Sequence, residues 1–359
     1  MREDGMVPEP VAHGRSLRSS DHDLQLVADL FNTEGAKKDL AFLKWQYVEK
    51  QSGAIYVDGA VADDRLAALY AVRPCTEGRV DGARTNFAQS LDTLTHQEFR
   101  GQGWFIRLAN SVYDRLREAD FALVYGFPNG SSAPGFFTKL GWVNLDPVPL
   151  LVRPIRIGYV LQRARHLGFV NRLFGRMALP IVPVRSRGIS LREVTDFGDD
   201  FDTLWEDFSA EVRVAIGRTS DYLISRISNR PGNTYTTVGA YRGDQLVGFV
   251  CYTVLPKHGG EIGYVLELLH APLEPRIGSL LLGHTLRVMK AAGADVALAW
   301  CLEHSPNRTA FRRSGFLTLP ERLRPIELHF GALALDERCR DAIADRKNWY
   351  LSYCDSDTV

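Results

Sequence analysis

The stretch "LTHQEFRGQGWF", residues 94–105, decides how the first half of this chain folds. It extends "TNFAQSLDTL", which reads as a strand, and it precedes a segment whose apolar residues recur at helical spacing from Phe105 to Leu116. A turn between a strand and a helix gathers unpaired backbone N–H groups at the positive end of the helix dipole, so it attracts an anion. Glycines in the turn let the backbone approach that anion closely. The stretch therefore predicts a phosphate-binding turn that opens a helix ending near Glu118.

Length and composition describe an ordinary globular protein. A chain of 359 residues with 45% hydrophobic residues has room for two domains, and 43 basic against 43 acidic residues create no overall attraction to nucleic acid. Residues 1–23 lack the apolar centre of a signal peptide, and no apolar run approaches the roughly 20 residues of a membrane-spanning helix, so we expect a cytoplasmic protein. Five cysteines without CxxC spacing indicate neither a disulfide framework nor a metal site.

The order of elements repeats along the chain. "AIYVDGAV" and "RLAALYAV" read as a hairpin, followed by a strand, the helix and the strand "FALVYGF". Later, "TTVGAY" and "LVGFVCYTVL" read as a second hairpin with Gly243 in its turn, followed by "EIGYVLELL", a helix and "DVALAWCL". Each copy ends in a short helical segment closed by glycine and an aromatic residue, "FFTKLGW" and "FRRSGF". The repetition predicts two related units in tandem.

The first copy resembles the GCN5-related N-acetyltransferase (GNAT) superfamily over residues 24–155. The pyrophosphate loop of that family reads Gln/Arg-x-x-Gly-x-Gly/Ala, and residues 98–103 read Glu-Phe-Arg-Gly-Gln-Gly, with a departure at the first position. The family also has an asparagine and an aromatic residue before a glycine–aromatic pair. This chain has Asn129 and Phe137 before Gly141 and Trp142. A phosphate loop of the ATPase kind fits less well, because no Gly-Lys-Ser/Thr ending is present.

The resemblance implies an α/β (α+β) fold with two tandem acetyltransferase-fold domains. Each would have a mixed, mostly antiparallel sheet flanked by helices. We expect a flexible tail over residues 1–23, a domain that binds acyl-coenzyme A over 24–155, a basic and partly helical linker over 156–188, and a second domain over 189–359.

By the same resemblance the co-substrate is acetyl-coenzyme A or another acyl-coenzyme A, with no metal. Its pyrophosphate would lie on the backbone amides of the glycine turn, and its pantetheine arm would run beside the end of the preceding strand. The residues expected to bind it are Thr93, Leu94, Thr95, Arg100, Gly101, Gln102, Gly103, Trp104, Asn129 and Phe137.

In such enzymes an amine attacks the thioester directly, so a base must take its proton. Asp92 and His96 are the nearest titratable groups, and Asp92 interrupts an apolar strand, where an unpaired carboxylate is costly. The alternatives are that neighbouring amides satisfy Asp92 in a structural role and that His96 is a capping or surface histidine. Many family members protonate the thiolate with a tyrosine at the position of Phe137, so here another group or water must act, or none is needed.

The second copy differs in its loop, "LEPRIGSLL". Aligning Gly278 with Gly103 puts Arg276 at the position of Gly101, and Pro275 removes an amide donor. We therefore expect that the second unit keeps the fold and has lost coenzyme binding. Glu267 and His270 lie on the strand of this copy that corresponds to the strand of Asp92, and they are two further candidates for acid–base chemistry. The alternative is a structural role, in which Glu267 pairs with an arginine and His270 is half buried.

The acceptor amine is indicated by composition and by short motifs. Residues 147–192 contain no acidic residue, and eight arginines lie between residues 153 and 187. Apolar residues from Val160 to Met177 recur at helical spacing, so part of this stretch is expected to be a basic amphipathic helix. "FLKWQY", "YGFPN" and "NWYLSYCDSDTV" resemble tandem proteins associated with bacterial surface polysaccharides, which implies a nucleotide-linked amino sugar whose phosphates the arginines would bind. Three alternatives stay open: another amine (a polyamine, an antibiotic or a protein lysine), a non-catalytic coenzyme-binding scaffold with a peripheral membrane contact, and a linker helix with solvated arginines.

Overall fold

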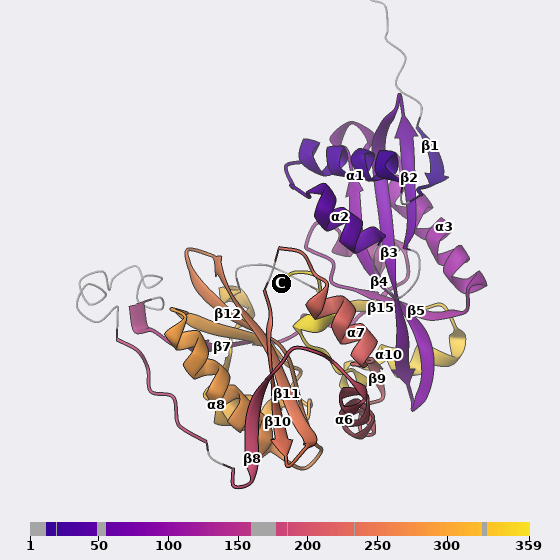
Figure 1. Ribbon diagram of the computed structural model, residues 1–359. Coiled ribbons are helices and arrows are strands. Elements are labelled where there is room, and N and C mark those ends of the chain that lie inside the picture. The colour runs from indigo at the N-terminus through magenta and orange to yellow at the C-terminus, as the bar shows by residue number, and fades with distance from the viewer. Residues whose placement is uncertain are drawn as a thin grey trace, which may run out of the picture. The chain divides into compact units, whose positions relative to one another are not determined.

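The computed structural model describes residues 12–18, 20–48, 55–158, 177–184, 186–232, 234–324 and 329–359. Two compact units divide the chain. Unit 1 consists of Met1–Thr76, Asn86–Asn144 and Gly331–Cys339, and unit 2 consists of Glu77–Thr85, Leu145–Phe330 and Arg340–Val359. Each unit has a mixed, mostly antiparallel sheet flanked by helices, which confirms the predicted fold class (Figure 1).

The sheet of unit 1 has the order β1-β2-β3-β4-β5-β15-β6. The pair β4–β5 is parallel because helix α3 (Trp104–Glu118) carries the chain back across the sheet between these two strands. The strands are β1 (His13–Ser16), β2 (Tyr56–Ala62), β3 (Arg65–Val80), β4 (Ala83–Thr95), β5 (Phe121–Gly126), β6 (Val143–Asn144) and β15 (Gly331–Ala334).

Helices cover both faces of this sheet. Because successive side chains of a strand point to opposite faces, Leu69 and Ala71 of β3 pack with α1 (Asp21–Thr33) and α2 (Leu40–Tyr47), whereas Tyr70 and Val72 pack with α3 (Trp104–Glu118). Two short turns of helix complete the unit, η1 (Gln97–Phe99) and η2 (Gly135–Lys139). The apolar face expected for the helix opened by the glycine turn is therefore confirmed.

The sheet of unit 2 has the order β14-β7-β13-β12-β11-β10-β8. Its parallel pair is β12–β13, joined by helix α8 (Pro275–Ala291), which packs on one face with Val250. Helix α6 (Asp199–Ser209) contacts Phe249 through Phe201. The strands are β7 (Leu150–Pro154), β8 (Ile189–Val194), β10 (Thr236–Arg242), β11 (Gln245–Lys257), β12 (Gly260–His270), β13 (Val296–Trp300) and β14 (Leu317–Thr318), and β9 (Val214–Ile216) pairs with the far end of β3.

The helices of unit 2 are α6 (Asp199–Ser209), α7 (Ser220–Leu223), α8 (Pro275–Ala291), α9 (Arg308–Arg313) and α10 (Arg340–Ala344). Short helical turns are η3 (Ile224–Ser228), η4 (Glu321–Leu323), η6 (Arg346–Asn348) and η7 (Tyr353–Asp355), and η5 (Glu337–Cys339) lies in unit 1. The two units thus repeat the order hairpin, strand, helix, strand, and Gly243 adopts the left-handed conformation expected of its turn, with φ 62°.

The units exchange one strand each, which the sequence did not indicate. β7, expected in the first domain, pairs with β13 of unit 2, and β15 pairs with β5 and β6 of unit 1. The expected boundaries at residues 155 and 189 therefore differ from those found, because unit 1 breaks off at Asn144 and recovers residues 331–339. The expected tail over residues 1–23 also differs, since its described part forms β1 and the start of α1.

The basic linker expected over residues 156–188 lies mostly outside the described residues. At its edge, Arg153 donates from Nε to the carbonyl of Ser314 at 3.2 Å and from Nη2 to the carbonyl of Pro180 at 2.7 Å, and Arg156 lies 3.8 Å from Asp295. These two arginines hold segments of unit 2 together. Among the described residues, no helix is both long and apolar enough to cross a membrane.

The placement of β15 can be tested at Gly331. A Cβ there would lie 2.9 Å from the carbonyl oxygen of Val143 and 2.5 Å from the Phe137 ring, whereas a Cβ at Gly14 of the same sheet would meet its nearest atom at 3.7 Å. We expect Gly331→Ala to lower the free energy of unfolding by about 1–3 kcal/mol and Gly14→Ala to change it by less than about 1 kcal/mol, measured by urea denaturation. Equal stabilities of the two variants would contradict the strand exchange.

Candidate functional site

Strands β4 and β5 part at one end of the unit 1 sheet. Their parallel register ends at the pair Ser90–Gly126, while β4 continues to Thr95. Beyond this pair lies a cavity of about 200 Å³, lined by residues 90–93 of β4, Gly126 at the end of β5, residues 127–129 after it, Ser132, Phe136 and Trp142. Strands that separate leave backbone N–H and C=O groups facing a ligand instead of a neighbouring strand.

The glycine turn lies between the end of β4 and α3. Gly101 and Gly103 have φ values of 80° and 76°, and no atom lies within 4 Å of a Cβ built on either, so their left-handed conformation and not lack of space requires glycine. Gly103 is the N-cap of α3, and the first turn of this 15-residue helix has neither a side-chain cap nor an acidic residue. Its N–H groups and the positive helix end are therefore available to an anion.

Side chains hold the turn in shape. Arg100 pairs with Glu34 and donates from Nε to the carbonyl of Thr95 at 3.1 Å. Arg107 donates to the carbonyl of Gln102 at 2.8 Å, and its guanidinium lies 3.7 Å from the centre of the Trp104 ring. Two cationic side chains therefore flank the amides that the sequence predicted to bind a pyrophosphate.

Asp92 is buried beside the cavity, with 7% of its surface exposed. Both of its carboxylate oxygens accept hydrogen bonds from the Lys38 ammonium at 2.6 Å, and Oδ2 accepts another from the Tyr47 hydroxyl at 2.7 Å. Sequence reasoning missed Lys38 and Tyr47, although a lysine just before the apolar segment "LAFLKWQY" could have been noted as a partner for a buried acid. The carboxylate of Asp92 is thus satisfied by an ammonium and a hydroxyl, and not by the neighbouring amides that the structural alternative expected.

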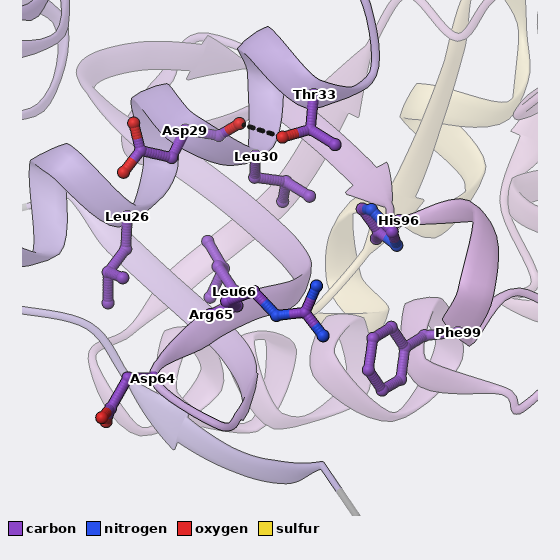
Figure 2. A pocket seen from close by; sticks show the side chains of 9 residues that line it. All are labelled: Leu26, Asp29, Leu30, Thr33, Asp64, Arg65, Leu66, His96 and Phe99. Atoms are coloured by element: carbon purple, nitrogen blue, oxygen red, sulfur yellow. Dashed lines mark hydrogen bonds between the residues drawn. The ribbon is translucent and has the colours of Figure 1, made fainter. Parts of the chain in front are cut away.

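His96 faces a different cavity. Its Nδ1 accepts a hydrogen bond from the Glu98 backbone N–H at 3.3 Å, so it caps the short helix η1, as the sequence allowed. Figure 2 shows it with Arg65 and Phe99 around a space of about 110 Å³. Because Asp92 and His96 line separate cavities, the structure does not bring the two candidate bases together.

Of the other residues expected to bind the coenzyme, some line the cavity and others pack in the core. Thr93 lines the cavity, and Leu94 packs against the core formed by α1 and α2. Asn129 accepts hydrogen bonds from the backbone N–H groups of Ser131 and Ser132 at 3.1 and 3.0 Å, which shapes the loop after β5. Phe137 packs against the core, while its neighbour Phe136, which was not predicted, lines the cavity.

In unit 2 the equivalent opening is filled. The parallel register of β12 and β13 ends at Val265–Ala299, and the space beyond has a volume of only about 10 Å³. The C-terminal segment, which we define as residues 349–359, lines this space with Tyr350, Leu351 and Ser352. The Tyr350 hydroxyl lies 3.2 Å from the carbonyl oxygen of Leu268, so a side chain of this segment occupies the space beside the backbone of β12.

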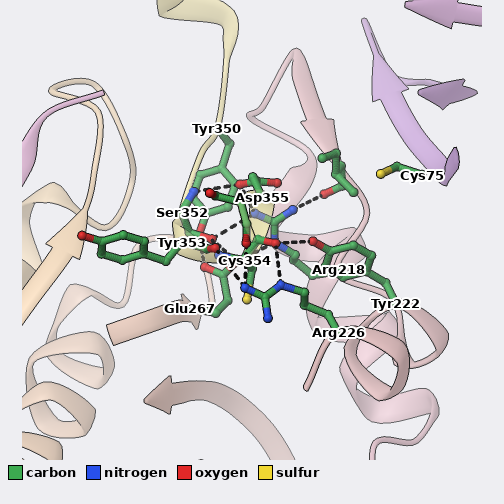
Figure 3. A network of polar contacts seen from close by, with 12 residues as sticks. Cys75, Arg218, Tyr222, Arg226, Glu267, Tyr350, Ser352, Tyr353, Cys354 and Asp355 are labelled. Atoms are coloured by element: carbon green, nitrogen blue, oxygen red, sulfur yellow. Dashed lines mark hydrogen bonds and ion pairs between the residues drawn. The ribbon is translucent and has the colours of Figure 1, made fainter. Parts of the chain in front are cut away.

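Glu267 lies two residues beyond the last parallel pair of its strand, as Asp92 does in unit 1. It is 1% exposed and binds Arg218, Tyr350 and Ser352, so the expected arginine pairing is found (Figure 3). Arg218 also binds Asp355 at 2.6 Å. Burial raises the pKa of the Asp355 carboxyl, and the Arg218 guanidinium acts against that rise. The C-terminal segment is thus fastened over Glu267 by buried ion pairs.

His270 is more deeply buried than the half-buried alternative expected, with 2% of its surface exposed. Its ring lies against Gly278, where a Cβ would come within 2.6 Å of Cδ2, so this glycine serves packing inside helix α8. Pro275 occupies the first turn of α8 and has no N–H to offer. Unit 2 therefore has no turn equivalent to Gly101 and Gly103 at this helix.

The described residues contain no group of three or more His, Cys, Asp or Glu side chains that could hold a metal ion. All five cysteines are free and buried. The polar groups found at the site in unit 1 are backbone amides, two flanking arginines and the Lys38–Asp92–Tyr47 cluster.

Comparison by sequence identifies one family. Residues 15–144 match the model described as an acetyltransferase (GNAT) domain, and the match ends where the central segment of unit 1 ends. A search of curated proteins finds no match.

Solved structures resemble most of the chain in fold. N-myristoyltransferase from Saccharomyces cerevisiae with bound myristoyl-coenzyme A has a TM-score of 0.62 at 13% identity, covering 91% of this chain and 84% of that one. A GCN5-related N-acetyltransferase from Anabaena variabilis has a TM-score of 0.62 at 13% identity, covering 93% and 75%. A protein from Enterococcus faecalis described as a probable N-acyltransferase has a TM-score of 0.58 at 13% identity, covering 91% and 73%. Residues 15–144 therefore match an acetyltransferase domain of the GNAT family, and the chain resembles N-acyltransferases of known structure in fold.

Proposed function

We propose that unit 1 binds acyl-coenzyme A and transfers its acyl group to a primary amine, and that unit 2 does not bind the coenzyme. The observation that carries this proposal is the uncapped glycine turn beside the open end of β4, set against the filled opening of unit 2. The pyrophosphate would accept hydrogen bonds from the amides of residues 101–104, with Arg100 and Arg107 beside it. The thioester would lie in the cavity between β4 and β5.

The reaction requires an oxyanion donor and a proton acceptor. The amine nitrogen attacks the thioester carbonyl carbon, the C–S bond breaks, and coenzyme A leaves as a thiolate. A backbone N–H of β4 beyond Ser90 would stabilise the carbonyl oxygen. Asp92 would take the ammonium proton, for which one of its hydrogen bonds to Lys38 or Tyr47 must be exchanged. Water would protonate the thiolate, since Phe137 has no hydroxyl.

For the acceptor we propose a nucleotide-linked amino sugar. The arginine-rich composition of residues 153–187 supports an anionic acceptor in a chain whose overall charge is balanced. Arg153 and Arg156 already hold parts of unit 2 together, so the other six arginines carry this proposal. Our proposal does not specify the length of the acyl chain. Assays with acetyl-coenzyme A and with myristoyl-coenzyme A compare a short chain with a long one.

Coenzyme binding is tested by one substitution and a matched control. Gly82 has φ 82° and, like Gly103, no atom within 4 Å of a built Cβ, so alanine strains both turns similarly. We expect calorimetry to give one acetyl-coenzyme A per chain, with affinity at least about tenfold weaker in Gly103→Ala, about 1.4 kcal/mol, and unchanged in Gly82→Ala. Two equivalent sites, or equal affinities of the two variants, would show that the glycine turn is not the coenzyme site.

The role of Asp92 is tested by Asp92→Asn, which keeps the volume and removes the charge. If Asp92 takes the amine proton, kcat should fall by about 10²–10⁴-fold while the affinity for acetyl-coenzyme A stays the same. His96→Gln should leave kcat close to that of the parent protein, because His96 lines the other cavity. An unchanged rate in Asp92→Asn would reduce the carboxylate to a structural partner of Lys38.

The acceptor proposal predicts a salt effect. The KM for a nucleotide-linked amino sugar should rise with ionic strength, because attraction between exposed charges is screened. Arg163→Gln and Arg172→Gln should raise KM with less effect on kcat, whereas Arg117→Gln, at an exposed ion pair of α3, should change neither. If both linker variants keep the parent KM, the acceptor is not recognised through this stretch.

A further inference from the structure

The cavity between β4 and β5 has a closed end that consists of two aromatic side chains, Phe136 and Trp142. Both line the cavity and are only 2% and 4% exposed, whereas Asn129 of the same lining set is exposed. Cη2 of Trp142 lies 3.4 Å from the position of a Cβ built on Gly126, so this ring closes the space at the last parallel pair of the two strands. A ligand that enters past Asn129 therefore directs its leading end at Phe136 and Trp142.

Buried hydrogen bonds hold the Trp142 ring in this position. Its Nε1 donates to the Tyr113 hydroxyl at 3.0 Å, and the hydroxyl oxygens of Tyr113 and Tyr70 lie 2.7 Å apart. Tyr70 also makes a side-chain hydrogen bond with Ser90, which lines the cavity from β4. Because the three aromatic rings are buried, turning Trp142 away from the cavity would leave an indole N–H and a hydroxyl without this bond, which is costly.

Phe136 is held by aromatic packing. The centre of its ring lies 4.7 Å from that of Trp142 and 5.0 Å from that of Phe105, and both contacts are edge to face. Its ring belongs to the core between the sheet and α3. The closed end is therefore part of a packed core, which does not yield easily to a longer ligand.

The volume of the cavity limits what can lie between its opening and this closed end. An apolar protein cavity of about 150 Å³ holds one benzene molecule, so about 200 Å³ holds about eight atoms of that size. The thioester carbon, oxygen and sulfur take three of these places, and the attacking amine needs room as well. The space that remains suits an acyl chain of about four carbon atoms.

The other walls offer a longer chain little in return. Apart from the two aromatic rings, most side chains around the cavity carry a hydroxyl, an amide or a carboxylate group. These polar lining residues are Ser90, Asp92, Thr93, Asn129 and Ser132. A chain that turned back along them would bury its methylene groups against polar atoms and displace water from those atoms.

We propose that Phe136 and Trp142 restrict the acyl group of the coenzyme thioester to chains of up to about four carbon atoms. This inference rests on the function proposed above for unit 1, and it adds the class of acyl group. The two rings determine specificity by excluding longer chains, and neither takes part in the proton transfers.

The test compares coenzyme A with its acetyl, butyryl and octanoyl thioesters by calorimetry on the full chain. Each buried methylene tightens binding about fourfold, so a long apolar channel would bind the octanoyl thioester about 200-fold more tightly than the butyryl thioester. We expect the reverse order, with the octanoyl thioester about fivefold weaker. Octanoyl binding as tight as butyryl binding, or tighter, would overturn the inference alone, whereas failure of all four compounds to bind would overturn the coenzyme assignment with it.

Matched variants assign the limit to the closed end. Phe136→Leu removes three carbon atoms there, so the affinity for hexanoyl-coenzyme A should rise about three- to tenfold while that for acetyl-coenzyme A stays the same. Phe121→Leu changes a buried ring of the same core that does not line the cavity, and it should alter neither affinity. Urea denaturation of both variants verifies that they fold. An unchanged hexanoyl affinity in Phe136→Leu, or an equal rise in both variants, would overturn the inference.

Discussion

Two neighbouring parallel strands that separate leave backbone N–H and C=O groups without a strand partner, and buried groups of this kind need another hydrogen-bond partner. Both units of this structure contain such a pair of strands. In unit 1, β4 and β5 separate beyond Ser90 and Gly126 around a cavity that a thioester substrate would fill. In unit 2, the same separation beyond Val265 and Ala299 is filled from within by the C-terminal segment. The same fold element is thus open in one unit and closed in the other.

The buried acids follow from the same constraint. Asp92 and Glu267 each lie two residues beyond the last parallel pair, where the strand leaves its neighbour. A carboxylate buried there is stable only with a cation and hydrogen-bond donors. Unit 1 supplies Lys38 and Tyr47, and unit 2 supplies Arg218 and Tyr350. The difference is that the pair in unit 1 borders an open cavity, whereas the C-terminal segment covers the pair in unit 2.

The sequence predicted what depends on near neighbours along the chain. The turn at Gly101 and Gly103, the helix after it and the two hairpins follow from local spacing and from glycine conformation. The exchange of β7 and β15 could not be predicted, because "LLVRP" and "GALA" are short apolar runs that would fit either sheet. The partners of Asp92 were not predicted because they are distant in sequence, and Lys38 lies 54 residues away.

Hydrogen exchange of the intact chain with and without acetyl-coenzyme A tests the contrast between the two openings most directly. Our account predicts that the coenzyme slows exchange at the amides of residues 91–95 and 101–105 in unit 1. It predicts no change at residues 266–270, where Tyr350 and its neighbours already occupy the opening. Equal slowing at both openings, or slowing confined to residues 266–270, would contradict the assignment of unit 1 as the coenzyme-binding unit.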